Sequence, residues 1–233
     1  MLPIRDRIPT RHFPFVTLTL IVINFAVFIL ELMVQGVGGE RALDQVFYLY
    51  GVVPAHITAD FGPKTGITLI TSMFLHGGWM HILGNMLYLW IFGNNVEDVL
   101  GHFWYGVFYF AAGFAASGLQ ILAATGSTVP GIGASGAIAG VLAAYLIFFP
   151  SARVDTLIFL GIFVAIRSLP AIVVLGVWFL LQLLNGVLSL SSAQMGGVAY
   201  FAHIGGFAAG LLLALPWVAK ARQAGPRRLY QYR

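Results

Sequence analysis

The chain has 233 residues, of which 59% are hydrophobic and only 9% are charged. Its mean hydropathy of +0.90 excludes an ordinary soluble protein and indicates a membrane protein. A formal net charge of +4 would suggest a nucleic-acid partner in a soluble protein; here the basic residues set membrane topology, and no nucleic-acid partner is expected. Because the chain has no cysteine, disulfides and thiolate nucleophiles are excluded, and any catalysis must use an oxygen nucleophile or histidine.

Six stretches of the chain are candidates for membrane-spanning helices, since a hydrocarbon core about 30 Å thick needs roughly 20 apolar residues per helix. They are residues 13–35, 79–92, 103–125, 135–149, 169–188 and 198–219. A further apolar stretch, 154–166, is too short to cross and is expected to lie at the membrane interface, between Arg153 and Arg167. The expected fold is therefore an all-α polytopic bundle of six transmembrane helices.

The basic residues are distributed unevenly between the two predicted sides. Only Arg41 and Lys64 fall on one side; the other carries Arg5, Arg7, Arg11, Arg153, Arg167, Lys220, Arg222, Arg227, Arg228 and Arg233. The positive-inside rule then predicts that both termini are cytoplasmic. The expected organisation is a cytoplasmic segment 1–12, a membrane domain 13–219 and a basic cytoplasmic tail 220–233. No transit or cleavage signal is recognised, which favours a prokaryotic inner (plasma) membrane.

Ser135 stands where the fourth apolar helix is predicted to begin, in the sequence Gly131-Ile132-Gly133-Ala134-Ser135-Gly136. Helix N-terminal N–H groups carry partial positive charge that suits an oxyanion, although a serine there is also a good N-cap. From Ser135 to Phe149 the helix would cover roughly 22 Å of a core about 30 Å thick. Ser135 is therefore expected below the outer membrane surface, in a water-filled cavity.

His203 lies well inside the sixth predicted span, where ionisable residues are rare and usually functional. The alternative is a histidine that bonds a carbonyl of a neighbouring helix. Small residues repeat on its helix face and on the fourth span: Ala199, Gly206 and Gly210, and Gly136, Gly140 and Ala144. Such faces let transmembrane backbones approach closely, as a Ser–His hydrogen bond of about 2.6 to 3.2 Å requires. The hypothesis is that Ser135 is a nucleophile and His203 its base.

The acidic residues bear on whether this pair is part of a triad. None of the eight lies within the predicted core of a span, so the sequence favours a Ser-His dyad. Nitrogens at His76, His81 and His203 could suggest zinc, but the chain has no His-Glu-x-x-His helix and no nearby acidic ligand. No metal and no cofactor are expected.

A third motif, from His76 to Asn85, leads into the second span. His81 and Asn85 are four residues apart and share a helical face, so both can direct donors to one point. Acyl transfer needs such donors where the carbonyl oxygen becomes negative, and one donor is worth about 3 to 4 kcal/mol.

Together these three motifs resemble the rhomboid intramembrane serine proteases of the prokaryotic six-span type. The matching residues, in chain order, are His76-Gly77 with His81 and Asn85, then Gly133-Ala134-Ser135-Gly136, then Ala202-His203 with Gly206 and Gly210. The resemblance implies that Ser135 attacks the peptide carbonyl, that His203 transfers the proton, and that the Ser135 N–H joins His81 and Asn85 in an oxyanion hole. It gives His76 and Glu97 structural roles. It also implies single-span membrane-protein substrates and a lipid bilayer as the obligatory partner.

Two positions depart from the family pattern. Arg41 has no tryptophan beside it, and Ala139 stands where some members place a tyrosine that stacks on the catalytic histidine. Tyr200 or Phe201 are candidates for that packing. Two other functions remain open from sequence: a rhomboid-like protein that binds membrane proteins without cleaving them, and a transporter in which His203 relays protons.

Overall fold

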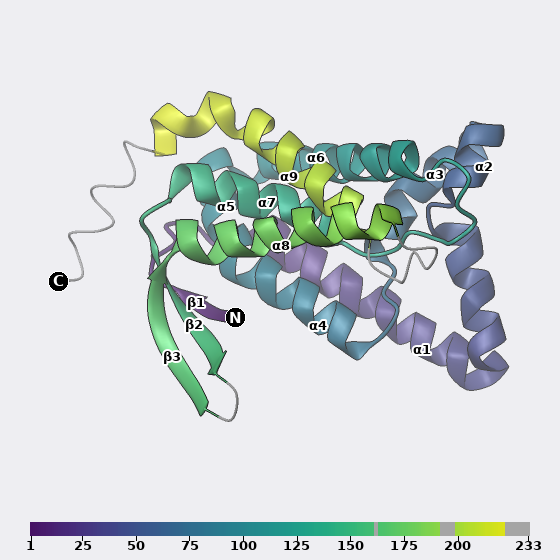
Figure 1. Ribbon diagram of the computed structural model, residues 1–233, viewed down its shortest axis with the longest axis horizontal. Helices are drawn as coiled ribbons and strands as arrows, with labels where there is room; N and C mark the ends of the chain where they lie inside the picture. Colours follow the sequence, from purple (N-terminus) through teal and green to yellow (C-terminus); the bar gives the residue numbers. More distant parts are fainter. Residues whose placement is uncertain (161–162, 192–198, 222–233) are drawn as a thin grey trace.

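A computed structural model describes residues 1–160, 163–191 and 199–221 of the chain (Figure 1). Helices cover all six predicted stretches. They are α1 (Phe15–Tyr50), a second helix made of α4 (Trp79–Tyr88), the π-helical turn η2 (Leu89–Gly93) and α5 (Asn94–Leu100), then α6 (His102–Ala123), α7 (Ser135–Phe148), α8 (Ala171–Ser191) and α9 (Tyr200–Ala214), which η3 (Leu215–Trp217) extends.

Four of these helices are long and apolar enough to cross a membrane, so the chain is a multi-pass membrane protein. Their membrane-compatible segments are Phe15–Tyr50, His102–Ala123, Ala171–Leu188 and Tyr200–Ala221. The α7 helix is shorter, and the α4–α5 helix is interrupted by its π turn. Six complete crossings therefore stay a prediction.

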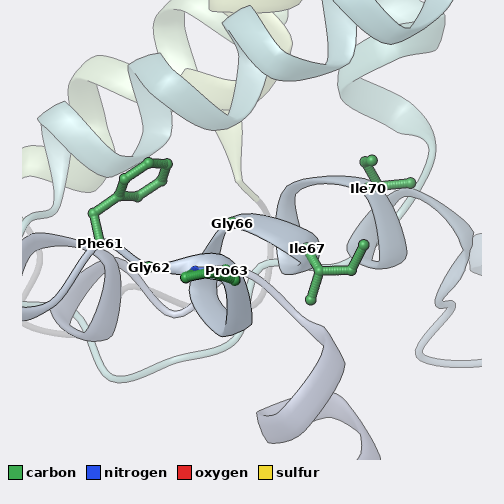
Figure 2. A pocket seen from close by; sticks show the side chains of 6 residues that line it. All are labelled: Phe61, Gly62, Pro63, Gly66, Ile67 and Ile70. Carbon is green, nitrogen blue, oxygen red and sulfur yellow. The ribbon is translucent and has the colours of Figure 1, made fainter.

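The α1 helix continues beyond its predicted end. Gly39, at φ 69°, forms a kink, beyond which the helix changes direction and runs across one end of the bundle toward α2 (Figure 1). Beyond Tyr50 the chain forms α2 (Pro54–Ala59), α3 (Pro63–Thr71) and the short turn η1 (Ser72–Phe74) before it enters α4. Figure 2 shows the apolar side chains of Phe61, Ile67 and Ile70 around a shallow pocket at α3.

The α7 helix is the centre of the bundle. All of its residues from Gly136 to Tyr145 are buried, and it packs against α9, α6 and the π turn. A helix that is apolar all round suits this position, since every face meets another helix. Pro150 follows its last turn and prevents its continuation. Residue 135 is thus held at the start of the most enclosed helix.

The expectation of an all-α fold is wrong in one region. A three-stranded antiparallel sheet, in the order β1-β2-β3, is formed by β1 (Leu2–Asp6), β2 (Arg153–Leu160) and β3 (Phe163–Pro170). It includes most of the stretch predicted to be interfacial and brings the N-terminus beside the connection between α7 and α8. The β1–β2 pairing joins residues about 150 positions apart and leaves no local signal, whereas the β2–β3 hairpin is local and was missed because a short apolar run does not distinguish a strand from a helix.

The sheet and the described end of α9 lie at one end of the bundle, as Figure 1 shows. This common end carries Arg5, Arg7, Arg153, Arg167 and Lys220. The rest of the predicted basic tail, 222–233, lies outside the described residues. The clustering agrees with the predicted even number of crossings, whereas the side of the membrane that this end faces stays a prediction.

Candidate active site

Ser135 and His203 are in direct contact. Ser135 Oγ lies 2.7 Å from His203 Nε2, although the two residues are 68 positions apart in the chain. Ser135 is the first residue of α7 and Ala134 occupies the N-cap position, so the N-cap alternative does not describe Ser135. His203 lies in the first turn of α9. The contact therefore joins the start of one central helix to the start of its neighbour.

The backbones of α7 and α9 make this contact possible because they almost touch. A Cβ atom added at Gly206 would overlap the carbonyl group of Gly136, and one added at Gly210 would overlap the backbone of Gly140. The predicted glycines of the two helices thus lie opposite one another. Any larger side chain would separate the helices and lengthen the Ser135–His203 contact.

His81 and Asn85 approach the same place from α4. Gly133, at φ 118°, brings the loop before α7 so near that a Cβ atom there would lie 2.6 Å from His81 Nε2 and 3.7 Å from Asn85 Nδ2. A side chain at position 133 is therefore excluded both by the left-handed backbone and by the His81 ring. The loop and α4 together place two side-chain donors next to the first N–H groups of α7.

The hydrogen bonds of His81 and Asn85 leave donors available. The Gly77 N–H donates to His81 Nδ1 at 3.3 Å, which leaves the proton on His81 Nε2, the atom nearest Gly133. Asn85 Nδ2 donates to His76 Nε2 at 2.9 Å and has a second hydrogen. Both groups can thus donate to an oxygen placed between them and Ser135.

His76 supports this arrangement from behind. Its ring donates through Nδ1 to the Phe74 carbonyl at 3.2 Å, so its Nε2 accepts from Asn85. Its backbone N–H donates to the Glu31 carboxylate at 3.1 Å. Glu31 is only 3% exposed, which corrects the expectation that no acidic residue lies in the core of a span. The correction arises because α1 continues to Tyr50, so Glu31 lies in the middle of a helix and not near its end.

Glu97, the other residue given a structural role, lies away from Ser135. Its carboxylate accepts from the Val16 and Thr17 N–H groups, both at 2.8 Å, and from Thr17 Oγ1 at 2.6 Å. His102 Nδ1 lies 2.6 Å from the same carboxylate. Glu97 therefore satisfies the free N–H groups at the start of α1 and ties that helix to α5 and α6.

A cavity of about 1040 Å³ opens over the Ser135–His203 pair. Its polar lining includes His81, Asn85, Gln120, Ser127 and Asn185. It shares no lining residue with the apolar pocket of Figure 2. A polar hollow at this place can hold water and an extended peptide backbone, which a packed helix interface could not.

Two residues of α8 that the sequence analysis did not identify contact His203. Gln182 Oε1 lies 2.8 Å from His203 Nδ1, and the Trp178 ring lies 5.9 Å from the imidazole, centroid to centroid. Trp178, and not Tyr200 or Phe201, therefore packs beside the histidine. The signal that could have found them is their spacing, since residues four apart share a helix face. In an apolar span, Gln182 is also a rare polar residue.

No carboxylate among the described residues hydrogen-bonds the His203 ring, whose Nδ1 meets Gln182 instead. Within residues 1–160, 163–191 and 199–221, no three His, Asp or Glu side chains are grouped as a metal site would require. The polar side chains gathered at the cavity are thus hydroxyls, imidazoles and amides.

Comparison with known proteins agrees with this geometry. A family model described as "Rhomboid domain" matches residues 63–220. RHOMBOID-like protein 4 of Arabidopsis thaliana is 35% identical over 154 residues, which are 64% of this chain and 33% of that protein. Rhomboid protein 1, mitochondrial, of Saccharomyces cerevisiae is 29% identical over 171 residues, 71% of this chain and 45% of that protein.

A mammalian relative shows the same partial overlap. Presenilin-associated rhomboid-like protein, mitochondrial, of Rattus norvegicus is 34% identical over 139 residues, 56% of this chain and 36% of that protein. The chain thus spans less than half the length of these curated relatives. They are eukaryotic, so they support the family but not the expected prokaryotic subtype. The family model covers most of the membrane domain and all of the motifs that meet at the cavity, and the chain belongs to the rhomboid family.

Proposed function

We propose that this chain is an intramembrane serine endopeptidase that hydrolyses peptide bonds in or beside the transmembrane segments of single-span membrane proteins. The observation that carries the proposal is the 2.7 Å contact between Ser135 Oγ and His203 Nε2 at the polar cavity. A nucleophile within hydrogen-bond reach of a base is the arrangement that covalent acyl transfer needs. Family membership supports the same reaction class.

In the first half of the reaction, Ser135 Oγ attacks the peptide carbonyl carbon and its proton passes to His203 Nε2. The tetrahedral intermediate collapses as the C–N bond breaks, and the leaving amine takes that proton. A water molecule then attacks the acyl-enzyme, gives a proton to His203 and releases Ser135 with its own proton restored. The chemistry uses only groups of this chain and requires no metal or cofactor.

The negative oxygen of the intermediate is stabilised by three donors. The backbone N–H of Ser135 lies at the N-terminus of α7, where helix N–H groups have no partner within the helix. His81 Nε2 and the second hydrogen of Asn85 Nδ2 complete the set from α4. Each such donor contributes roughly 3 to 4 kcal/mol to the transition state.

The proposed substrate must expose its backbone. A transmembrane helix keeps its carbonyl groups hydrogen-bonded, so a substrate segment has to unwind before Ser135 can reach a carbonyl carbon. The polar side chains of the cavity give the unwound segment alternative hydrogen-bond partners. Helices that unwind easily are therefore expected to be cleaved faster than stable ones.

The first experiment compares wild type, Ser135→Ala and His203→Ala with the control Ser117→Ala, which changes a serine of α6 outside the cavity. Each protein is tested in liposomes for cleavage of a fluorogenic transmembrane substrate and for labelling by a fluorophosphonate. We expect the two site variants to lose roughly 10⁴-fold or more in cleavage rate, together with labelling. A folded wild type that neither cleaves nor labels would replace this proposal with that of a non-proteolytic membrane-protein binder.

We also propose that the end of the bundle bearing the sheet faces the cytoplasm, in a cell inner (plasma) membrane. The positive-inside rule supports this orientation. The cysteine-free chain allows a direct test with Ser151→Cys at the sheet end and Asp60→Cys near α3. In intact cells, an impermeant maleimide should label only the cysteine at position 60. Labelling of position 151 alone would reverse the orientation.

A further inference from the structure

We propose that Gln182 is the positioning residue of the base, holding His203 in the tautomer that can accept the Ser135 proton. The inference rests on the proposed proteolytic function and identifies the residue that makes its base competent. Gln182 comes from α8, so a fourth helix takes part in a site whose sequence motifs lie on α4, α7 and α9.

The two hydrogen bonds of the His203 ring determine its tautomer. Gln182 Oε1, 2.8 Å from Nδ1, is an amide oxygen and can only accept, so Nδ1 carries the hydrogen. In the neutral ring Nε2 is then an acceptor, and it lies 2.7 Å from the Ser135 hydroxyl. If Gln182 were absent, the hydrogen could occupy Nε2 instead. The ring would then donate to Ser135 and could not take its proton.

Trp178 restricts the same ring by packing. It lies one helical turn before Gln182, and its ring plane is inclined 39° to the imidazole. Gln182 therefore determines the rotation of the imidazole, and Trp178 limits its tilt. Trp178 also packs on Phe207, which ties the α8 contact to the next turn of α9.

An amide suits this position better than a carboxylate for a reason of solvation. An ionised carboxylate in a membrane-spanning helix carries a large solvation cost, whereas a neutral amide avoids the cost of a buried charge. The amide still provides the acceptor that selects the tautomer. It gives up the strong stabilisation of an imidazolium that a carboxylate partner would provide.

The test uses Gln182→Met, which keeps the length of the side chain and removes the acceptor. Gln182→Glu restores an acceptor, and Leu181→Met is the matched control because Leu181 is 50% exposed and does not line the cavity. We expect Gln182→Met to lower kcat by about 10²-fold or more with KM unchanged, and fluorophosphonate labelling to slow in parallel. Gln182→Glu should recover most of the lost kcat, and Leu181→Met should match wild type.

A second readout reports the tautomer without activity. Nitrogen-15 NMR of histidine-labelled protein, with His203→Ala used to assign the signal, should show a protonated Nδ1 and an unprotonated Nε2 in wild type. Gln182→Met should show a mixture of tautomers. If Gln182→Met does not fold, Gln182→Asn replaces it, because its oxygen falls about one bond short of Nδ1.

The outcomes separate this proposal from the proposed function. An active wild type whose kcat is unchanged by Gln182→Met overturns the role of Gln182 and leaves the protease proposal standing. An inactive wild type in which the substitution still shifts the tautomer overturns the protease proposal and leaves the positioning role standing. A wild-type His203 without a proton on Nδ1 overturns the positioning role directly.

Discussion

The two ends of the helical bundle both bury polar groups, but they use them differently. At the sheet end, the Glu97 carboxylate accepts from two backbone N–H groups and a hydroxyl, and Asp6 accepts from Asn95 and Tyr145 at 2.7 and 2.8 Å. At the cavity end, His81 and Asn85 retain donors that face open space. Fully paired groups stabilise a fold, whereas donors directed into a cavity can stabilise a charge that develops there.

The difference extends to the packing between helices. The sheet end is joined by polar side chains, while α7 and α9 below the cavity are joined by glycine backbones. A hydrogen bond between side chains can adapt to a small shift of a helix, but touching backbones cannot. Substitutions at the glycine contact should therefore change both stability and activity. Substitutions at the sheet end should change mainly stability, and those at the cavity end mainly activity.

Gly206→Ala is expected to have the largest effect. The new methyl group would overlap the Gly136 carbonyl, so α9 must move away from α7 and His203 must leave Ser135. We expect the free energy of unfolding, measured in detergent, to fall by about 3 kcal/mol or more, and cleavage activity to be lost as well. Gly118→Ala on α6 is the control, because a Cβ atom there has open space. Equal stability of the two variants would contradict the backbone contact.

His81→Ala should lower activity strongly and stability little. The substitution removes one proposed oxyanion donor while the buried His76–Asn85 pair remains. We expect kcat to fall about 10²- to 10³-fold with KM unchanged, measured on the fluorogenic substrate. A change confined to KM would instead assign His81 to substrate binding.

Glu97→Gln should do the reverse, lowering stability while cleavage per folded molecule stays the same. In either orientation of the new amide, its NH₂ group would face the N–H of Val16 or Thr17 in place of an acceptor. A buried donor left without an acceptor costs about 1 to 3 kcal/mol in the free energy of unfolding. Glu40→Gln, at an exposed position of α1, should change it by less than about 0.5 kcal/mol. Loss of activity per folded molecule would show that the two ends are coupled.

Asp155→Asn should have the smallest effect. Arg7 and Arg5 donate to this carboxylate at the sheet, and the Arg7 contact in particular lowers the pKa of Asp155 below its ordinary value of 3.8. The arginine side chains are 55% and 72% exposed, so solvent screens the pairs and the loss should stay within about 1 kcal/mol.

The pH dependence identifies this contribution. Because the pKa is lower in the folded state, the stabilisation is present above the unfolded pKa and is lost as pH falls through the folded pKa. Wild type and Asp155→Asn should therefore differ in unfolding free energy near neutral pH and converge in acid below about pH 4. Parallel curves across that range would contradict an ionised Asp155 in the sheet.

The sequence by itself determined the features that arise from local pattern. Apolar stretches located the helices, because a lipid environment demands about 20 apolar residues wherever a helix crosses. Ser135 and His203 could be paired because each stands on a helix face of small residues, and such faces indicate close helix contact. His81 and Asn85 could be placed together by their spacing of four along α4.

Other features depend on contacts between distant parts of the chain, and only the tertiary structure decided these. Pairing of β1 with β2 joins residues far apart in sequence, so no local period reveals that the N-terminal strand completes the sheet. Glu31 could be assigned to His76 only once α1 lay beside the loop before α4. The spacing of Trp178 and Gln182 places them on one helix face, but only the packing of α8 beside α9 shows that this face meets His203. Their proximity is set by how the helices pack, and residue spacing along one helix carries no information about which neighbour its polar face will meet.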